Sequence, residues 1–493
     1  MLNAIKEKLT SIFWENKKSS EMVMSEGLKQ HYFGSGNKGL VLGELRLSIQ
    51  DTRKNLLIIA PNGSGVVSRF IIPSLLNLQA SAVVIDKEIN RGDKQIFNLT
   101  SGYLKSRGYN IKLFQPANVS ESLRFNPLAR IDTNKQIQEL SSILTDYQLK
   151  LDSEDIKSFL AEELANADPN QTKNLEYFLF RKIKEGVRYL IHGVIVALKS
   201  FSIKEGNLKE FHFAAVRKIL QRLMDLEDSE VREFIKENVN LGNWDYPQDE
   251  NWHCFEPWNL VLEPLRPGRS KYSKRLTEVI LKAALSTLDL WSDSDIVKLT
   301  SSDDLEIENL ISKKTVIYIV VSEEDIEKYS FIIQLFLLSC FKYSYDNQET
   351  RESQEVYYFL NAFSCLTPFP QFALWLDKLQ EAKTSISIVL NTSEQIQKVY
   401  QVDPSSVDAY WHYENEKRIK GFKTRLFLGG LDYETGKYVE GIFDYRDRPF
   451  LAEELRSLRY NQALLVCDYR SPVFFEIKSF AGDKKLNQLL EWY

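Results

Sequence analysis

The sequence is poor in the residues that most often form covalent cross-links and metal sites. It has four cysteines and five histidines in 493 residues, and the cysteines, at positions 254, 340, 365 and 467, form no CxxC pair. Structural zinc sites need closely spaced Cys and His ligands, and disulfide frameworks need many cysteines. The sequence therefore predicts no metal site and no disulfide bonds, which fits a reducing cytoplasm.

Excess positive charge and long apolar runs are also missing. The 68 acidic side chains outnumber the 63 Lys and Arg side chains, and the formal net charge of −5 argues against a surface that binds nucleic acid over its whole extent. The best apolar run, FIIQLFLLSCF at 331–341, is shorter than the roughly 20 residues that span a bilayer. We therefore expect a cytoplasmic protein with no direct membrane span, which associates with the inner membrane through partners.

The sequence does contain an α/β pattern that stops and later resumes. Apolar strand-like segments alternate with helix-like segments in the N-terminal part, as in NLLIIA at 55–60 and SAVVID at 81–86. Strand-like segments return later as TVIYIVV at 315–321 and SISIVLN at 385–391. Such alternation is typical of parallel βαβ units.

Between these two parts, the apolar residues follow helical spacing and no convincing strand interrupts them. We therefore predict one α/β domain with a mostly parallel sheet, formed by residues 1–133 and 276–493. An all-α insert at 134–275 is predicted to separate its two halves.

Several strings in this order resemble the type IV coupling protein family. These are RecA-like hexameric ATPases that bring DNA or protein cargo to type IV secretion and conjugation machines. The strings include LLIIAPNGSG, SAVVIDKE, TSGYLKSRGYNIKLFQP and RFNPLA, and the resemblance resumes beyond the insert. Asp86, Lys87 and Glu88 stand where the family has an aspartate, a lysine and a glutamate at the end of a strand. The resemblance implies a RecA-like P-loop NTPase domain.

A phosphate-binding loop, the Walker A motif, is predicted in APNGSGVVSR at 60–69, between a strand and a helix. In the family this loop resembles A-P-T-G-S-G-K-T, in which the lysine neutralises phosphate oxygens and the threonine ligates magnesium. Here two valines stand at the lysine and threonine positions, so the loop keeps its turn and loses its charge and its hydroxyl. The degenerate loop comprises Gly63, Ser64, Gly65, Val66 and Val67.

The two residues after the loop offer a hydroxyl and a cation that a register shift would bring into use. Ser68 and Arg69 follow the valines directly. We expect their helical positions to point both side chains away from the loop, which argues against such a rescue.

The resemblance implies further losses at the catalytic positions. Where the family's Walker B strand ends in L-D-E-F, with carboxylates for magnesium and for the attacking water, this chain has Asn361 and Ala362. Asn391 stands where the family has a glutamine that senses the γ-phosphate. The helix before it carries arginines in the family, and here it offers Lys378 and Lys383.

These losses leave two hypotheses. In the first, the chain is a coupling-protein-like pseudo-ATPase, an adaptor or structural subunit that recruits cargo or completes a ring with an active homologue. In the second, it is a DNA-translocating hexameric ATPase that neighbouring subunits complete. The first predicts no catalytic residue and no cofactor, with ATP and magnesium unexpected. Its partners would be type IV secretion or conjugation components, an active coupling-protein homologue, and protein cargo or DNA.

Two basic clusters are candidates for nucleic-acid contacts, although solvated surface is the interpretation we favour for each. Between them lie Tyr410, Trp411 and Tyr413, which we interpret as an interface rather than as a base-stacking platform. The basic candidates are Arg266, Arg269, Lys271, Lys420, Lys423 and Arg425.

Overall fold

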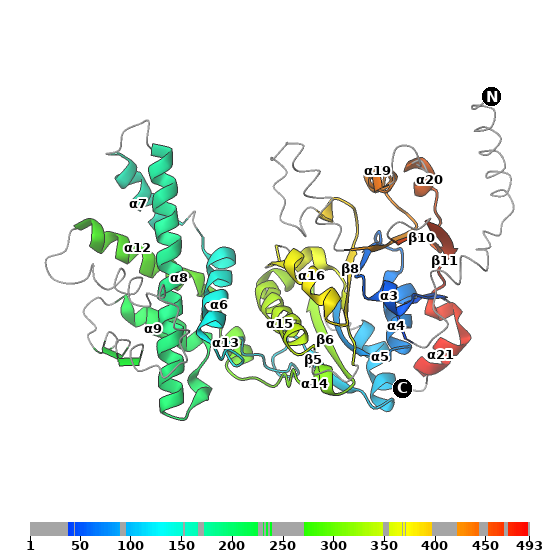
Figure 1. The fold of residues 1–493 in the computed structure, drawn as a ribbon, viewed down its shortest axis with the longest axis horizontal. Coiled ribbons are helices and arrows are strands. Elements are labelled where there is room, and N and C mark those ends of the chain that lie inside the picture. The colour runs from blue at the N-terminus through cyan, green and yellow to red at the C-terminus, as the bar shows by residue number, and fades with distance from the viewer. Residues whose placement is uncertain are drawn as a thin grey trace. The chain divides into compact units, whose positions relative to one another are not determined.

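Buried apolar runs form the strands of a large, mostly parallel sheet in the computed structural model (Figure 1). The structure describes residues 38–43, 45–88, 95–150, 153–165, 172–224, 230, 233–234, 237–238, 271–348, 354–366, 368–369, 371–396, 422–442, 452–467 and 472–491. The strands, in their order across the sheet, are β11 (Val473–Glu476), β10 (Gln462–Cys467), β9 (Thr424–Leu428), β3 (Leu56–Ile59), β8 (Thr384–Leu390), β7 (Val356–Leu360), β4 (Ser81–Glu88), β6 (Thr315–Ser322) and β5 (Asn110–Phe114).

The sheet is parallel from β9 to β5, and β10 is antiparallel to both of its neighbours. Helices cover both faces, which is why these strands are apolar without alternation. On β7, for example, Phe359 packs on Phe70 with ring centroids 5.8 Å apart, while the adjacent Tyr358 packs on Phe341 at 4.8 Å. Neighbouring residues of one strand thus contribute to two different layers of the core.

Short and long helices connect these strands, and a small ribbon of β1 (Val41–Leu42) and β2 (Leu45–Arg46) precedes them. The helical segments of this unit are α3 (Ile49–Thr52), η1 (Val67–Ile71), α4 (Ile72–Leu76), α5 (Gln95–Ser106), α14 (Asn309–Ser312), α15 (Ile326–Asp346), η5 (Phe363–Leu366), α16 (Phe372–Glu381), α19 (Tyr433–Ile442), α20 (Ala452–Arg456), η6 (Phe480–Gly482) and α21 (Lys484–Glu491).

The insert forms a second unit whose described residues contain helices and no strand. The long helix α8 (Thr172–Lys204) lies at its centre and contacts four other helices of the unit. The remaining helical segments are α6 (Asn134–Gln148), α7 (Glu154–Ala165), η2 (Leu208–Glu210), α9 (Phe213–Leu223), α12 (Lys271–Thr287), η4 (Asp289–Ser292) and α13 (Ser294–Thr300).

The second unit spans residues 118–305, whereas the sequence predicted an insert at 134–275. The additional residues belong to it because they hydrogen-bond within it. The backbone N–H of Phe125 donates to the carbonyl of Leu299 at 2.9 Å, and the Asn126 side chain donates to the carbonyl of Phe211 at 2.8 Å. Arg130 also pairs with Asp303 on the returning segment. The added residues before α6 are irregular and carry no periodic signal, so a boundary drawn from periodicity misses them. The added residues after 275 are mostly helical, in α12, η4 and α13, and only their contacts place them in this unit.

Helix α8 is long enough and apolar enough to cross a membrane, judged by length and composition alone. It is not evident as an uninterrupted apolar run in the sequence, because polar residues interrupt its apolar ones. Within the unit, 61% of its most apolar 18-residue window is buried.

Two basic side chains of α8 hold the segment that enters α6. Lys199 donates to the carbonyl of Ile131 at 2.7 Å, and His192 Nε2 lies 2.6 Å from Asn134 Oδ1. Burial, together with the nearby Arg188, lowers the pKa of His192 to about 4. His192 is therefore neutral in the folded unit at neutral pH.

The segment that leads into β3 joins the two halves of the split domain. Asn55 is fully buried and has a left-handed backbone with φ of 55°. Its side chain donates to the carbonyl of Leu376 at 3.1 Å and accepts from the N–H of Ile386 at 3.0 Å. One side chain thus bonds to residues more than 300 positions later in the chain.

We predict that Asn55→Ala lowers the free energy of unfolding of this unit by about 3 kcal/mol, because two buried groups lose their partners. Urea denaturation followed by circular dichroism measures this loss. The control is Asn487→Ala, which removes an exposed hydrogen bond of 2.8 Å to the Ala481 carbonyl. Equal losses in both variants would contradict the role assigned to Asn55.

We also predict that protonation of His192 destabilises the insert at low pH. Its pKa of about 4 in the folded state lies below the unfolded value of about 6.5, so the unfolded chain binds the proton first as the pH falls. This costs about 3 kcal/mol between pH 7 and pH 4. Denaturation at several pH values, compared with His192→Gln, checks this. The same pH dependence in both proteins would refute it.

Candidate functional site at the carboxyl edge of the sheet

Three parallel strands end side by side and bring the predicted motifs together. Ile59 of β3 pairs with Leu390 of β8, and Leu360 of β7 pairs with Ile388 of the same strand. The segments that follow β3, β8 and β7 therefore leave the sheet at one edge. In open α/β sheets, ligands bind outside the carboxyl ends of the strands. This edge holds the predicted loop, the Asn361–Ala362 pair and Asn391, and is the candidate site.

The loop after β3 keeps the backbone of a tight, glycine-dependent turn. Gly63 and Gly65 have φ of 82° and 74°, values that favour glycine. The N–H of Ser64 donates to the carbonyl of Pro61 at 2.9 Å. A methyl group added at Gly63 would meet no atom within 4 Å, so the tip of the loop is open.

The two valines of the loop contribute to the apolar core. Val66 and Val67 are partly buried, and both pack against the main hydrophobic cluster under the sheet. Val67 also packs on a smaller cluster that includes Leu486 of the C-terminal helix α21, which lies beside α4 (red in Figure 1). The two valines, which we predicted to stand at the lysine and threonine positions of the loop, are thus engaged in packing.

The helix after the loop begins with a π-turn at Val67–Ile71, in which the N–H of Ile72 donates to the carbonyl of Val67. Pro73 explains this geometry, because it has no N–H to donate and its ring clashes with the carbonyl four residues earlier. Widened turns of this kind recur at functional sites.

Ser68 and Arg69 turn back to the loop, which differs from the expectation that both point away. The Ser68 hydroxyl donates to the carbonyl of Gly65 at 3.1 Å, and the Arg69 guanidinium donates to the carbonyl of Ser64. The reason is that helical side chains lean towards the N-terminus of their helix, so a long side chain reaches the preceding turn.

The end of β7 has a strained backbone and no carboxylate. Asn361 and Ala362 are half-buried, and Ala362 has φ of 58°, a left-handed conformation that disfavours side chains. The N–H of Cys365 donates to the carbonyl of Ala362 at 3.0 Å, which stabilises this turn. Neither side chain can act as an acid, a base or an anionic metal ligand.

The acidic groups on the neighbouring strand β4 make structural contacts. Asp86 accepts the N–H of Phe97 at 2.8 Å at the start of α5, and Glu88 accepts a hydrogen bond from Gln115 at 2.9 Å. Lys87 pairs with Glu323 at 3.1 Å. These contacts hold α5 and the loops after β5 and β6 in place.

Asn391 and Lys378 make contacts with residues close to them. The backbone N–H of Asn391 donates to the Gln395 side chain at 2.8 Å. Lys378 lies over the rings of Trp375 and Tyr345, at 5.0 and 5.5 Å from their centroids. Lys383 follows α16 with φ of 48°.

Of the six basic candidates, the two whose side chains the structure describes lie away from this site. Lys423 is exposed just before β9, at the amino edge of the sheet, and Arg425 donates to the carbonyl of Phe422 at 3.3 Å. The side chain of Lys271, in α12, is not described. Outside the described residues lie Arg266, Arg269, Lys420, Tyr410, Trp411 and Tyr413.

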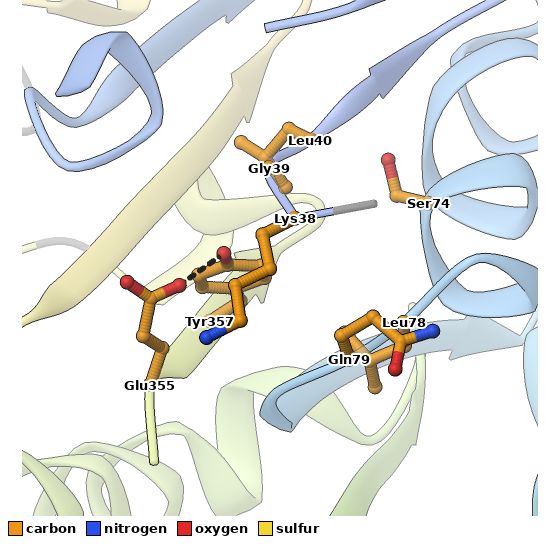
Figure 2. Close-up of a pocket in the computed structure, with 8 residues that line it drawn as sticks. All are labelled: Lys38, Gly39, Leu40, Ser74, Leu78, Gln79, Glu355 and Tyr357. Carbon is orange, nitrogen blue, oxygen red and sulfur yellow. Dashed lines mark hydrogen bonds between the residues drawn. The ribbon is translucent and has the colours of Figure 1, made fainter. Parts of the chain in front are cut away.

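A small cavity lies at the opposite, amino edge of the sheet (Figure 2). The Tyr357 hydroxyl donates to Glu355 at 2.6 Å there, and Arg53 also binds this carboxylate. Burial, and then the charge of Glu355, raises the pKa of Tyr357. The cavity volume of about 10 Å³ is enough for about one water molecule. No group of three or more potential metal ligands gathers anywhere in the part of the chain that the structure describes.

Comparisons with known proteins agree on one family. The family model described as "Type IV secretory system Conjugative DNA transfer" matches residues 12–245 and 257–409. Protein VirD4 of Rhizobium radiobacter is 22% identical over 413 residues, which cover 83% of this chain and 50% of that protein. The chain therefore spans about half the length of this curated relative.

Solved structures agree with the fold. The bacterial conjugative coupling protein TrwBdeltaN70, in complex with sulphate, matches with a TM-score of 0.61 and 13% identity over 92% of both chains. The plasmid coupling protein TrwB in complex with ADP and Mg2+ matches with a TM-score of 0.61 and 12% identity over 93% of this chain and 92% of that one. These likenesses confirm the predicted RecA-like α/β fold.

We predict that Ala362→Gly stabilises the protein by about 0.5–1 kcal/mol, because glycine adopts the left-handed backbone without steric cost. Thermal denaturation followed by circular dichroism measures the gain. The control is Ala382→Gly, at a buried residue with φ of −91°, which is expected to lose about 1 kcal/mol. A loss in both variants would show that Ala362 is not strained.

Proposed function

Since this chain belongs to the type IV secretory system conjugative DNA transfer family, we propose that it is a coupling-protein-like subunit that does not hydrolyse nucleoside triphosphates. In this role it acts as an adaptor or structural subunit that recruits cargo or an active homologue. The observation that carries the proposal is the set of residues at the carboxyl edge of the sheet. There Val66, Val67, Asn361 and Ala362 stand together where phosphoryl transfer needs a cation, a hydroxyl and two carboxylates.

The chemistry of phosphoryl transfer supports this proposal. The reaction depends on positioning and on charge stabilisation, so catalysis requires a magnesium ion and a cation on the phosphates, and a group that orients the attacking water. Asn361 offers an amide, which carries no charge, and the Ala362 methyl group can neither orient nor polarise water. A loss at one position would weaken turnover, and losses at all of them abolish it.

The packing of the valines gives independent support. A loop that bound phosphates would expose polar side chains at these positions, whereas Val66 and Val67 pack against apolar clusters. Restoring a lysine or threonine there would place a charge or a hydroxyl against apolar neighbours, which costs free energy. The loop therefore serves the stability of the domain.

The helical insert is the part we assign to recruitment. On α8, Tyr177 and Phe178 are 72% and 49% exposed, and Lys182 lies 4.6 Å from the centroid of the Phe178 ring. Aromatic side chains are enriched at protein interfaces, so the two exposed rings mark a candidate contact surface. We propose that the partners are type IV secretion or conjugation components, with protein cargo or DNA. A cytoplasmic location, with inner-membrane association through these partners, is part of the proposal.

The competing function is a DNA-translocating hexameric ATPase that neighbouring subunits complete. The observation in its favour is that Ser68 and Arg69 bring a hydroxyl and a cation back to the loop. The carboxylates of the second motif have no such local replacement at residues 361–366. They would have to come from another subunit.

We predict that the purified chain, alone or with single-stranded DNA, shows no ATP turnover above the protein-free background. A fluorescent ATP analogue titrated with magnesium is expected to show no binding below about 1 mM, because the charge-assisted contacts are missing. Micromolar binding with turnover in the same sample would overturn the proposed function.

The matched control carries Val66→Lys, Val67→Thr, Asn361→Asp and Ala362→Glu. If the four losses are the cause of inactivity, this variant gains nucleotide binding while its melting temperature falls. Turnover above background that is equal in the variant and the unaltered chain would instead assign activity to groups outside these four positions.

A further inference from the structure

We propose that Arg69 is an internal ligand of the predicted phosphate-binding loop. Its cation, which is part of the chain, holds residues 61–66 in their turn without a nucleotide. The inference rests on the proposed function, because a loop with its own ligand suits a chain that no longer cycles through nucleotide states. It assigns to Arg69 a structural task that a bound ligand otherwise performs, namely ordering the loop.

The contacts of Arg69 support this role. Its guanidinium donates to the Ser64 carbonyl, while its own backbone N–H donates to the Gly65 carbonyl at 2.9 Å. Ser68 donates to the same Gly65 carbonyl at 3.1 Å. A guanidinium has only donors, so it binds the carbonyl oxygens of the loop. Two consecutive carbonyl groups of the loop are thus held from the first turn of the following helix.

Gly65 is shaped to receive the guanidinium. A methyl group added at this position would lie 2.6 Å from Arg69 Nη1, which is closer than real contacts, so the guanidinium would have to move away from the loop. The absence of a side chain therefore lets the guanidinium lie against the loop backbone. At Gly63, which has a similar positive φ, the added methyl group would meet nothing. The two glycines of the loop thus differ in this contact while sharing a similar backbone strain.

Pro73 contributes to the geometry from which the Arg69 side chain reaches the loop. Because Pro73 cannot donate a hydrogen bond, the chain forms a π-turn at Val67–Ile71, and Arg69 sits within that turn. A regular helix would present the side chains of this segment at different angles.

A bound oxyanion is the competing account. Ser64 Oγ and Arg69 Nε are buried atoms that have no hydrogen-bond partner in the structure. If the loop binds a phosphate group, these two atoms and the Arg69 cation are the groups that would hold it. Arg69 would then be a ligand-binding residue, and the loop would be ordered by the anion.

The difference between the two glycines is the basis of the test. We compare Gly65→Ala with Gly63→Ala in the full chain, each with and without Arg69→Met, by hydrogen exchange of the peptides covering residues 61–68. Gly65→Ala is expected to speed exchange at least about fivefold more than Gly63→Ala does. This excess is expected to vanish when Arg69 is already Met. An equal effect of the two glycine substitutions, or an excess that persists in Arg69→Met, would overturn the proposal.

Arg69→Met alone is expected to speed exchange in the loop and to lower the melting temperature by about 2–4 °C, while Arg69→Lys recovers part of both. The same proteins are then measured with inorganic phosphate and with ATP and magnesium. The internal-ligand proposal predicts no protection by either. Protection that disappears in Arg69→Met would overturn it in favour of a phosphate site. ATP turnover by the unaltered chain is a separate result that contradicts the proposed function, whatever the exchange data show.

Discussion

Parallel pairing of β3 with β8 and β9 is the constraint on which the rest of this structure depends. Residues 56–59 pair with 387–390 on one side and with 424–427 on the other, so the two halves of the split domain must form one sheet. Asn55 reinforces this pairing at the amino edge through its two buried hydrogen bonds. Because this pairing closes a very long loop, the inserted residues 118–305 are most easily accommodated as a unit with a core of its own.

The same pairing determines what the carboxyl edge can do. Parallel strands place the loops after β3, β8 and β7 next to one another, which is the arrangement that nucleotide-binding folds use. In this chain Val66, Val67, Asn361 and Ala362 at that edge carry no charge, and the nearby acidic groups of β4 hold helix α5 and neighbouring loops. The fold is retained, and at this edge Val66 and Val67 pack against apolar clusters while Arg69 hydrogen-bonds within the loop.

Much of the candidate site was predictable because its signals are local. Gly63 and Gly65 mark the turn, the apolar segment at 56–59 marks the strand before it, and the order of motifs indicated the family. The direction of the Arg69 side chain was not predicted, because its hydrogen bond to the Ser64 carbonyl depends on the backbone geometry of the π-turn that follows the loop. The left-handed backbone of Ala362 also has no sequence signal, since the residue type disfavours it.

The sequence by itself determined the α/β class and the helical character of the insert, and it has no lysine, threonine or carboxylate at positions 66, 67, 361 and 362. These follow from residue identity and from short-range periodicity. Only the tertiary structure decided that the insert extends over 118–305 and that Val67 packs with the C-terminal helix. It also decided that Arg69 turns back to the loop. These depend on contacts between residues far apart in the chain, or on backbone geometry that side-chain identity does not encode.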